Sequence, residues 1–302
     1  MNINQNPILT NTVLFLEKIN LLSPKRLSQI KYFLRFGKRA NLKNPQNLNE
    51  KVLWLAHNTD TSRWTELADK YRVRKYVEDC GLGHLLVKLY GVYDSADDID
   101  FDKLPQSFVF KTNNGCGTVM LVEDKSKLNI EQTRQTLNKW LKMPFGIMSA
   151  EPHYRRMKPC IIAEEYLKDE NETSSSLIDY KIWCFEGKPY YVFTACNRKI
   201  GEDSVDFGFY DANDWVSKKE LLNKNKRTDN KIVLPKPQNL SEMLDAATKL
   251  SKPFPILRVD LYNVNGKIYF GELTFTSHGG LMPNYTPECL QMMGEKVTLQ
   301  NK

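Results

Sequence analysis

Two short segments near the carboxyl end of the sequence alternate polar and apolar side chains in a way that could build a metal site. Arg258 and Asp260 alternate with apolar residues in "ILRVDLY", and Glu272 and Thr274 do so in "GELTFT". Successive side chains of a strand point to opposite faces, so each segment predicts a strand with one core face and one polar face. Two carboxylates about 4 Å apart repel by roughly 4 kcal/mol at an effective dielectric near 20. A divalent cation would relieve that repulsion, and Mg2+ suits a site made only of oxygen ligands.

The connection between the two strands decides whether the acids meet. Asn265-Gly266 predicts a hairpin turn. A two-residue turn without a bulge would put Asp260 and Glu272 on opposite faces of the sheet. A three-residue loop, Val264–Gly266, or a bulge of equal effect puts them on the same face. We favour the three-residue loop because it also collects the apolar residues of both strands on one core face: Leu257, Val259, Leu261, Leu273 and Phe275. The alternative to a metal site is that Arg258 pairs with one acid while the other faces water.

A glycine-rich stretch, "VFKTNNGCGTVMLVED", predicts a strand, a loop and a second strand. The first strand ends at Lys111, and the loop contains Asn114, Gly115 and Gly117. The glycine spacing fits neither a Walker A loop nor a Rossmann fingerprint. Such a hairpin is by itself more often only a tight turn, but its bare backbone N–H groups can also close over phosphates. We interpret residues 113–117 as a mobile flap with few side-chain contacts.

Two further strands carry acids or an acid with a base. In "IDYKIWCF", Asp179 and Lys181 share one face of the predicted strand, and "CIIAEEYL" ends in Glu164 and Glu165. Taken alone, each pattern is also typical of a solvated strand edge.

The remaining segments predict helices that must position these strands. Helical periodicity runs over residues 13–39 and breaks at Ser23-Pro24, with Pro at the first helical position of a basic second helix. That basic helix predicts either a solvated face or contact with a membrane surface or an anionic polymer. Its cations are Lys25, Arg26, Lys31, Arg35, Lys38 and Arg39.

Further helices are predicted along the rest of the chain. One has Asn47 or Asn49 near its cap, and the next is "LADKYRVRKYVEDCGLG", which ends at Gly81 or Gly83. The segments "EQTRQTLNKWLKM" and "LSEMLDAATKLSK" predict two more. The polar segment 203–230 predicts a long surface excursion.

Composition limits the class of protein. The 302 residues carry a formal net charge of +7, which by itself fits phosphate-bearing ligands or an anionic membrane surface as well as nucleic acid. We expect no nucleic-acid partner. The six cysteines form no CxxC pair, so we expect no zinc site and a reducing, cytoplasmic location. We also expect no signal peptide and no membrane span.

Taken in order, these motifs resemble the ATP-grasp superfamily. Lys70 lies in a DK pair before the glycine loop, and "EEYL" and Asp179-Tyr180-Lys181 come before the Arg258, Asp260, Glu272 series. Thr274 stands where many ATP-grasp enzymes carry Asn. The phrases "LPQSFVFKTNNGCG", "IDYKIWCFEGKP" and "VDLYNVNGKIYFGELTFTSHGG" are most similar to the TupA-like ATP-grasp family. That family is associated with the biosynthesis of cell-surface polysaccharides, including teichuronopeptide.

The resemblance implies an α/β (α+β) fold with a small lid subdomain and a larger antiparallel-sheet subdomain, preceded by short N-terminal helices. The implied ranges are 1–66, 67–160 and 161–302. The implied cofactors are ATP and Mg2+, with the metal held by Asp260, Glu272 and Thr274. The implied nucleotide-binding residues are Lys70, Lys111, Asn114, Gly115, Gly117, Glu164, Glu165, Tyr166, Leu167 and Asp179.

The resemblance also implies an activity. It is carboxylate–amine ligation through an acyl phosphate, with Arg258, Lys181 and Arg198 as catalytic residues and His278 near the acceptor. The acceptor would be a small molecule or a saccharide, such as a uronic acid or amino acid unit. The enzyme would be cytoplasmic, with peripheral association with membrane polysaccharide machinery. The alternatives are an ATP-dependent kinase, a glycosyltransferase of capsule biosynthesis, and a non-catalytic nucleotide-binding scaffold at the membrane.

Overall fold

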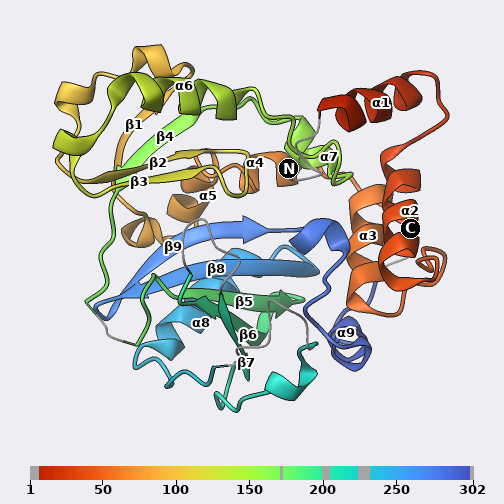
Figure 1. The fold of residues 1–302 in the computed structure, drawn as a ribbon. Coiled ribbons are helices and arrows are strands. Elements are labelled where there is room, and N and C mark those ends of the chain that lie inside the picture. The colour runs from red at the N-terminus through yellow and green to blue at the C-terminus, as the bar shows by residue number, and fades with distance from the viewer. Residues whose placement is uncertain (1–6, 171–172, 199–204, 224–231, 300–302) are drawn as a thin grey trace. The chain divides into compact units, whose positions relative to one another are not determined.

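The chain forms two compact units (Figure 1). The structure is a computed structural model that describes residues 7–170, 173–198, 205–223 and 232–299.

Each unit is built from separated parts of the sequence. The first consists of Met1–Leu27, Asp60–Tyr76 and Leu86–Leu167. The second consists of Ser28–Thr59, Val77–Leu85 and Lys168–Lys302. The expected domain ranges 1–66, 67–160 and 161–302 stay a prediction. Two helices, α2 (Pro24–Phe36) and α5 (Val73–Asp79), contribute residues to both units.

The first unit is a four-stranded antiparallel sheet in the order β1-β4-β2-β3, covered by α6 (Figure 1). Its strands are β1 (Leu89–Tyr93), β2 (Phe108–Thr112), β3 (Val119–Val122) and β4 (Ile161–Glu165). Its helices are α1 (Pro7–Lys18), α4 (Ser62–Leu67), α6 (Ile130–Leu141) and α7 (Pro152–Arg155), with 3₁₀ turns η3 (Ala96–Asp98), η4 (Phe101–Lys103) and η5 (Lys125–Lys127).

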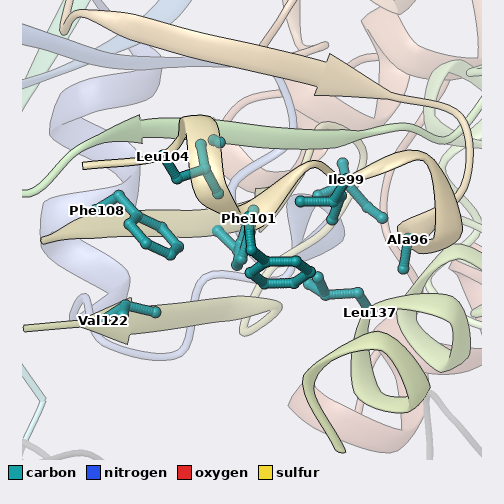
Figure 2. Packing of buried hydrophobic residues seen from close by; sticks show 10 residues of the cluster. Ala96, Ile99, Phe101, Leu104, Phe108, Val122 and Leu137 are labelled. Atoms are coloured by element: carbon teal, nitrogen blue, oxygen red, sulfur yellow. The ribbon is translucent and has the colours of Figure 1, made fainter. Parts of the chain in front are cut away.

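Alternation along β2 separates a core face from a polar face in this unit. Figure 2 shows Phe108 from β2 and Phe101 packed with Leu137 from α6, and Phe108 and Leu137 are fully buried. The helix begins where expected because the Asn129 side chain accepts a hydrogen bond from the backbone N–H of Gln132. The opposite face of β2 is therefore the one that presents Lys111.

The second unit is a five-stranded antiparallel sheet in the order β7-β6-β5-β8-β9. Helix α8 packs across one of its faces (Figure 1). Its strands are β5 (Asp179–Phe185), β6 (Lys188–Cys196), β7 (Asp206–Asp211), β8 (Ile256–Val264) and β9 (Lys267–Thr274). Its helices are α3 (Leu48–Asn58), α8 (Leu240–Ser251) and α9 (Pro287–Gly294), with 3₁₀ turns η2 (Gly83–Leu85), η6 (Lys219–Leu221) and η7 (Ser277–Gly280).

The hairpin between β8 and β9 differs from the expected loop. Val264 pairs with Lys267, so the connection is a two-residue turn, and the three-residue loop is wrong. Asn265 and Gly266 both have positive φ, 51° and 79°, as the favoured two-residue hairpin turn requires.

The bulge named as the equivalent of that loop is present further along the hairpin. Asp260 pairs with Glu272 while Leu261 pairs with Phe270, which leaves Gly271 as the extra residue. A Cβ on Gly271 would lie 2.9 Å from the Asp260 carbonyl oxygen, so only glycine fits without a shift. The shared core face is confirmed, because all five of its residues are buried: Leu257, Val259, Leu261, Leu273 and Phe275.

Two other expectations are corrected. The helix predicted from Leu67 is interrupted, because Asp69 accepts hydrogen bonds from the backbone N–H groups of Tyr71 and Arg72 and forms a turn there. Lys70 therefore lies in a turn before α5. The segment 203–230 is not only a surface excursion, since it contains β7; residues 203–204 and 224–230 of that call lie outside the described residues.

The helices predicted around these strands are largely confirmed. Pro24 begins α2, and the Asn47 side chain caps α3 by accepting from the Glu50 N–H. No helix within the described ranges combines the length and the apolar character that a bilayer span requires.

Candidate functional site

In the second unit, the polar face of the sheet collects charged side chains from three adjacent strands. Lys181 of β5 pairs with Asp260 of β8, and Asp260 pairs with Glu272 of β9, so the three residues form a row across the sheet. Arg258 pairs with Thr274 in the next row. The structure thus brings together five of the residues singled out in the sequence, here called the Arg258 cluster: Lys181, Arg258, Asp260, Glu272 and Thr274.

The Asp260 carboxylate is the centre of this cluster. Arg258 binds it with two hydrogen bonds, Nε to Oδ1 and Nη2 to Oδ2, both of 2.7 Å. The Lys181 ammonium donates to the same Oδ2, also at 2.7 Å. The Asp260 side chain is only 4% exposed, so these charge-assisted bonds compensate for its lost hydration. The pairing of Arg258 with one acid, the alternative inferred from the sequence, is therefore present.

The buried acids keep the two cations charged. Burial alone would lower the pKa of Lys181, but Asp179 and Asp260 outweigh it, and the pKa is raised. Burial likewise opposes the charge on Arg258, and Asp260 raises its pKa above the ordinary value. Both side chains are therefore fixed positive charges on this face of the sheet.

Asp179 carries its own pair of cations next to the cluster. It accepts a 2.8 Å hydrogen bond from Arg198 and lies 3.5 Å from the Lys181 ammonium. Arg198 is half exposed, whereas Asp179 is mostly buried. Asp179 also raises the pKa of the half-buried Tyr262 phenol, the residue opposite it on β8. Tyr262 was not singled out in the sequence, although its place in the alternation of β8 puts it on the polar face.

Two more side chains orient Arg258 and were missed in the sequence. Ser277 Oγ accepts a 2.7 Å hydrogen bond from Arg258 Nη1, and the Trp183 ring lies 6.0 Å from the guanidinium carbon. Trp183 is held in turn by a 2.8 Å hydrogen bond to the Tyr285 hydroxyl. Alternation with Asp179 and Lys181 could have identified Trp183, whereas Ser277 lies in a loop and has no periodicity.

Glu272 is the second carboxylate of the cluster. Its side chain is 33% exposed, accepts a 3.1 Å hydrogen bond from Thr274, and lies 3.4 Å from Arg258. Asp260 Oδ1 accepts a single hydrogen bond, so it keeps a lone pair. Within the described residues, no group of three or more acidic, histidine or cysteine side chains could hold a metal alone. The donor chemistry therefore fits Mg2+ only if other oxygens, such as those of a phosphate, complete the coordination.

The loop after β9 is strained next to the cluster. His278 has a positive φ of 51° and is exposed, and Gly279 and Gly280 also have positive φ. A side chain in the left-handed region is costly for residues other than glycine, and such strain is common at functional sites.

In the first unit, the polar face of the sheet holds a second charged group. The Lys111 ammonium of β2 forms an ion pair with the Glu164 carboxylate of β4, whose side chain is 7% exposed. Arg74 lies 3.5 Å from the same carboxylate and donates a 3.0 Å hydrogen bond to the Val87 carbonyl. Arg74 was not singled out in the sequence. Two cations around one acid leave this group with a net positive charge.

The glycine loop is more tightly held than expected. Asn113 is fully buried and makes three side-chain hydrogen bonds, to the Asp69 carboxylate at 2.6 Å, the Lys158 carbonyl at 3.0 Å and the Cys160 N–H at 2.8 Å. The expectation of few side-chain contacts is wrong at this residue. Lys70 donates a 2.8 Å hydrogen bond to the Gly115 carbonyl.

The glycine loop has a buried part, Asn114 and Gly115, and an exposed tip, Cys116 and Gly117. A Cβ on Gly115 would lie 2.6 Å from the Phe145 ring, so any other residue here would have to displace that ring. Asn114 is buried, and its Oδ1 has no hydrogen-bond partner within the described residues. Cys116 and Gly117 are exposed. Only this tip has the freedom that a moving flap needs.

The "EEYL" segment begins with Glu164, the acid that Lys111 and Arg74 contact. The backbone N–H of Glu165 donates to the Lys88 carbonyl at 2.9 Å, and the Tyr166 hydroxyl donates to Glu123 at 3.0 Å. Burial raises the pKa of Tyr166, and the hydrogen bond to Glu123 adds to the shift. Glu165 and Leu167 are half-buried. Their roles toward a nucleotide stay predictions.

Comparison with known protein families identifies the family. The model of the TupA-like ATPgrasp family matches residues 50–298. The chain belongs to this family. Both units of this TupA-like protein lie largely within the match, and the resemblance inferred from the sequence is confirmed, as is the mixed fold of helices and antiparallel sheets. A search of curated proteins gave no match.

Several solved structures are similar at low identity. D-alanine–D-alanine ligase from Bacillus anthracis is 16% identical over 84% of this chain and 70% of its own, with a TM-score of 0.46. L-amino acid ligase from Bacillus licheniformis is 14% identical over 83% of this chain and 54% of its own, with a TM-score of 0.46. Biotin carboxylase from Campylobacter jejuni is 10% identical over 85% of this chain and 53% of its own, also with a TM-score of 0.46.

Proposed function

We propose that this TupA-like protein is an ATP-dependent carboxylate–amine ligase that modifies a cell-surface polysaccharide or its precursor. The observation that carries the proposal is the Arg258 cluster, in which two carboxylates and two fixed cations share one face of a sheet. The family supplies the nucleotide as the expected substrate. The saccharide substrate, a uronic acid or amino acid unit, follows from the family's association alone.

The proposed reaction has two steps. An oxygen of the substrate carboxylate attacks the γ-phosphorus of ATP, and the bond to the β–γ bridging oxygen breaks to release ADP. The nitrogen of the amine then attacks the carbonyl carbon of the acyl phosphate, loses a proton and expels inorganic phosphate. Both steps move negative charge onto phosphate oxygens, so positioned cations are the main requirement.

The cations of the second unit would meet this requirement. Arg258 and Lys181 are held charged by buried acids, and their remaining N–H donors would bind oxygens of the transferring phosphoryl group. Ser277 and Trp183 hold Arg258 in place and would position it. Arg198 would orient the acceptor, and Asp179 would accept a hydrogen bond from the ribose.

Asp260 and Glu272 would hold Mg2+, with the Thr274 hydroxyl beside Glu272. The bound ion supplies positive charge opposite the phosphate oxygens. Because Asp260 Oδ1 accepts only one hydrogen bond, it could become a ligand without breaking its bond to Arg258.

The first unit carries further residues proposed to bind the nucleotide. Lys111 has ammonium protons beyond the one given to Glu164, and with Lys70 it would neutralise phosphate charge. The N–H groups around Asn114, Gly115 and Gly117 would cover the phosphates. The backbone of Glu165, Tyr166 and Leu167, after Glu164, would contact adenine.

A product assay tests this function. The protein is incubated with ATP, Mg2+ and mixtures of uronic acids and amino acids, and mass spectrometry follows the products. The ligase yields ADP, phosphate and a new amide in equal amounts. Asp260→Asn should abolish the amide, and the matched variant Asp245→Asn, on the exposed side of α8, should not. A phosphorylated acceptor without an amide would identify a kinase instead, and nucleotide binding without turnover would identify a scaffold.

A further inference from the structure

The outer side of helix α2 exposes a group of large apolar side chains. Ile30, Phe33 and Leu34 are 49%, 52% and 77% exposed, and their i, i+3, i+4 spacing places them on one side of the helix. The opposite side is already used in packing, because Tyr32 is buried in one cluster with Leu53 of α3. Helices α2 and α3 are neighbours in Figure 1. The exposed side, here called the α2 outer face, is therefore not needed to hold the helix in the fold.

The same helix and the residues after it carry a concentrated positive charge. No Asp or Glu occurs between Glu17 and Glu50. Arg35, Lys38 and Arg39 are exposed and form no ion pair with any described residue. The full set of basic residues from the helix to its exit is Lys25, Arg26, Lys31, Arg35, Lys38 and Arg39.

We propose that the α2 outer face docks on the surface of an anionic lipid bilayer. Phe33, Leu34 and Ile30 would enter the boundary between headgroups and acyl chains, and the flanking cations would bind lipid phosphates. This inference goes beyond the ligase function and does not depend on it.

The charge and the apolar residues together select this partner. A second copy of the chain would bring the same cations against each other, so like charges would oppose a dimer through this face. A soluble anionic polymer would match the cations but would leave Phe33 and Leu34 in water. A bilayer with anionic headgroups satisfies both features at once.

Vesicle co-sedimentation with the full chain tests the proposal. The protein should sediment with phosphatidylcholine vesicles that contain phosphatidylglycerol and stay in solution with phosphatidylcholine alone. Arg35→Glu with Lys38→Glu should weaken binding more than tenfold, since each cation near such a surface contributes about fivefold. Phe33→Ser with Leu34→Ser should weaken it at least tenfold.

Matched controls lie on other exposed helix surfaces. Lys249→Glu reverses an exposed charge on α8, and Ile130→Ser removes an exposed apolar side chain at the start of α6. Both variants should leave vesicle binding unchanged. Circular dichroism and thermal melting check folding. If the double apolar variant does not fold, Leu34→Ser alone, at the most exposed position of the face, replaces it.

Several outcomes would overturn the proposal. These are equal binding to neutral and anionic vesicles, no binding to either, or binding that both double variants leave intact. A dimer in solution that disappears with Phe33→Ser and Leu34→Ser would assign the face to a second copy. Tight binding to a soluble anionic polysaccharide that does not depend on Phe33 or Leu34 would assign the cations to a polymer.

Discussion

The β-bulge at Gly271 gives the sharpest test of how the Arg258 cluster is built. In Gly271→Ala, the new Cβ would lie 2.9 Å from the Asp260 carbonyl oxygen and 3.3 Å from a Tyr262 ring carbon. Ordinary contacts of this kind begin at 3.4 Å, so β8 and β9 must separate locally by the difference between 3.4 and 2.9 Å. The carbonyl belongs to the backbone of a central strand, and it cannot rotate away as a side chain would.

Two opposing effects set the change in the free energy of unfolding of Gly271→Ala. Overpacking of this kind typically costs about 1–3 kcal/mol. Replacing a glycine removes freedom from the unfolded chain and returns about 0.4–1 kcal/mol. A net loss of about 1–2 kcal/mol should lower the melting temperature by about 2–3 °C in a chain of 302 residues, because the entropy of unfolding is roughly 2 cal/mol/K per residue. The same shift displaces Asp260 from Glu272, and we expect at least a tenfold loss of ATP turnover because catalysis is sensitive to misplacements of this size.

Thermal unfolding and magnesium-dependent ATP turnover measure both effects. The control is Gly266→Asn in the turn of the same hairpin, where φ is +79° and no atom lies within 4 Å of the added Cβ. Asparagine tolerates positive φ, so the control should keep most stability and activity. Wild-type melting and turnover in Gly271→Ala, or an equal loss in the control, would refute the reasoning.

Three further predictions concern other groups. Asp260→Asn and Glu272→Gln should each reduce ATP-dependent turnover at least a hundredfold with little loss of helix and sheet signal; normal turnover in both would remove the metal assignment. Backbone hydrogen exchange in the glycine loop, residues 113–118, should slow when a non-hydrolysable ATP analogue binds, and the slowing should be largest at the exposed tip. If exchange slows elsewhere but not in this loop, the loop does not cover the nucleotide. Burial lowers the pKa of His153 to about 3, so the unfolded chain binds a proton below pH 6.5 that the folded chain does not. The contribution of His153 to the free energy of unfolding should therefore fall by about 1.6 kcal/mol between pH 6.5 and pH 5. His84→Gln, at an exposed position, should show the same fall, and His153→Phe should remove most of it.

The sequence was sufficient where a strand has one polar and one apolar face. Alternation in β8 and β9 correctly placed Arg258, Asp260, Glu272 and Thr274 on one side, because an opposite arrangement would have buried charges in the core. The same reasoning placed Lys181 on the polar face of β5, where its hydrogen bond to Asp260 confirms it.

The sequence was not sufficient to predict how the β8–β9 hairpin brings its polar residues to one face, because a single extra residue in the backbone decides it. The shared face could come from an odd loop or from a bulge, and both preserve the alternation of side chains. A glycine inside a strand often marks a bulge, and Gly271 lies inside the strand "KIYFGELT". This glycine is the sequence signal that favours the bulge over the odd loop. Long-range polar contacts were also invisible, and Asn113 is the clearest case, because its partners come from Asp69, Lys158 and Cys160.

The hydrogen bonds that Lys51 of α3 makes to the end of α9 and the residues after it affect how the chain folds during synthesis. The Lys51 ammonium donates to the carbonyls of Gly294 and Val297, at sequence separations of 243 and 246 residues. At about 5–20 residues per second, a ribosome needs roughly 10–50 s to make the chain between these partners. Val52 and Leu53 of α3 are buried in the finished unit, yet their unit cannot close until α9 emerges. Throughout that interval, the apolar side of α3 is a target for chaperones and for aggregation with neighbouring nascent chains.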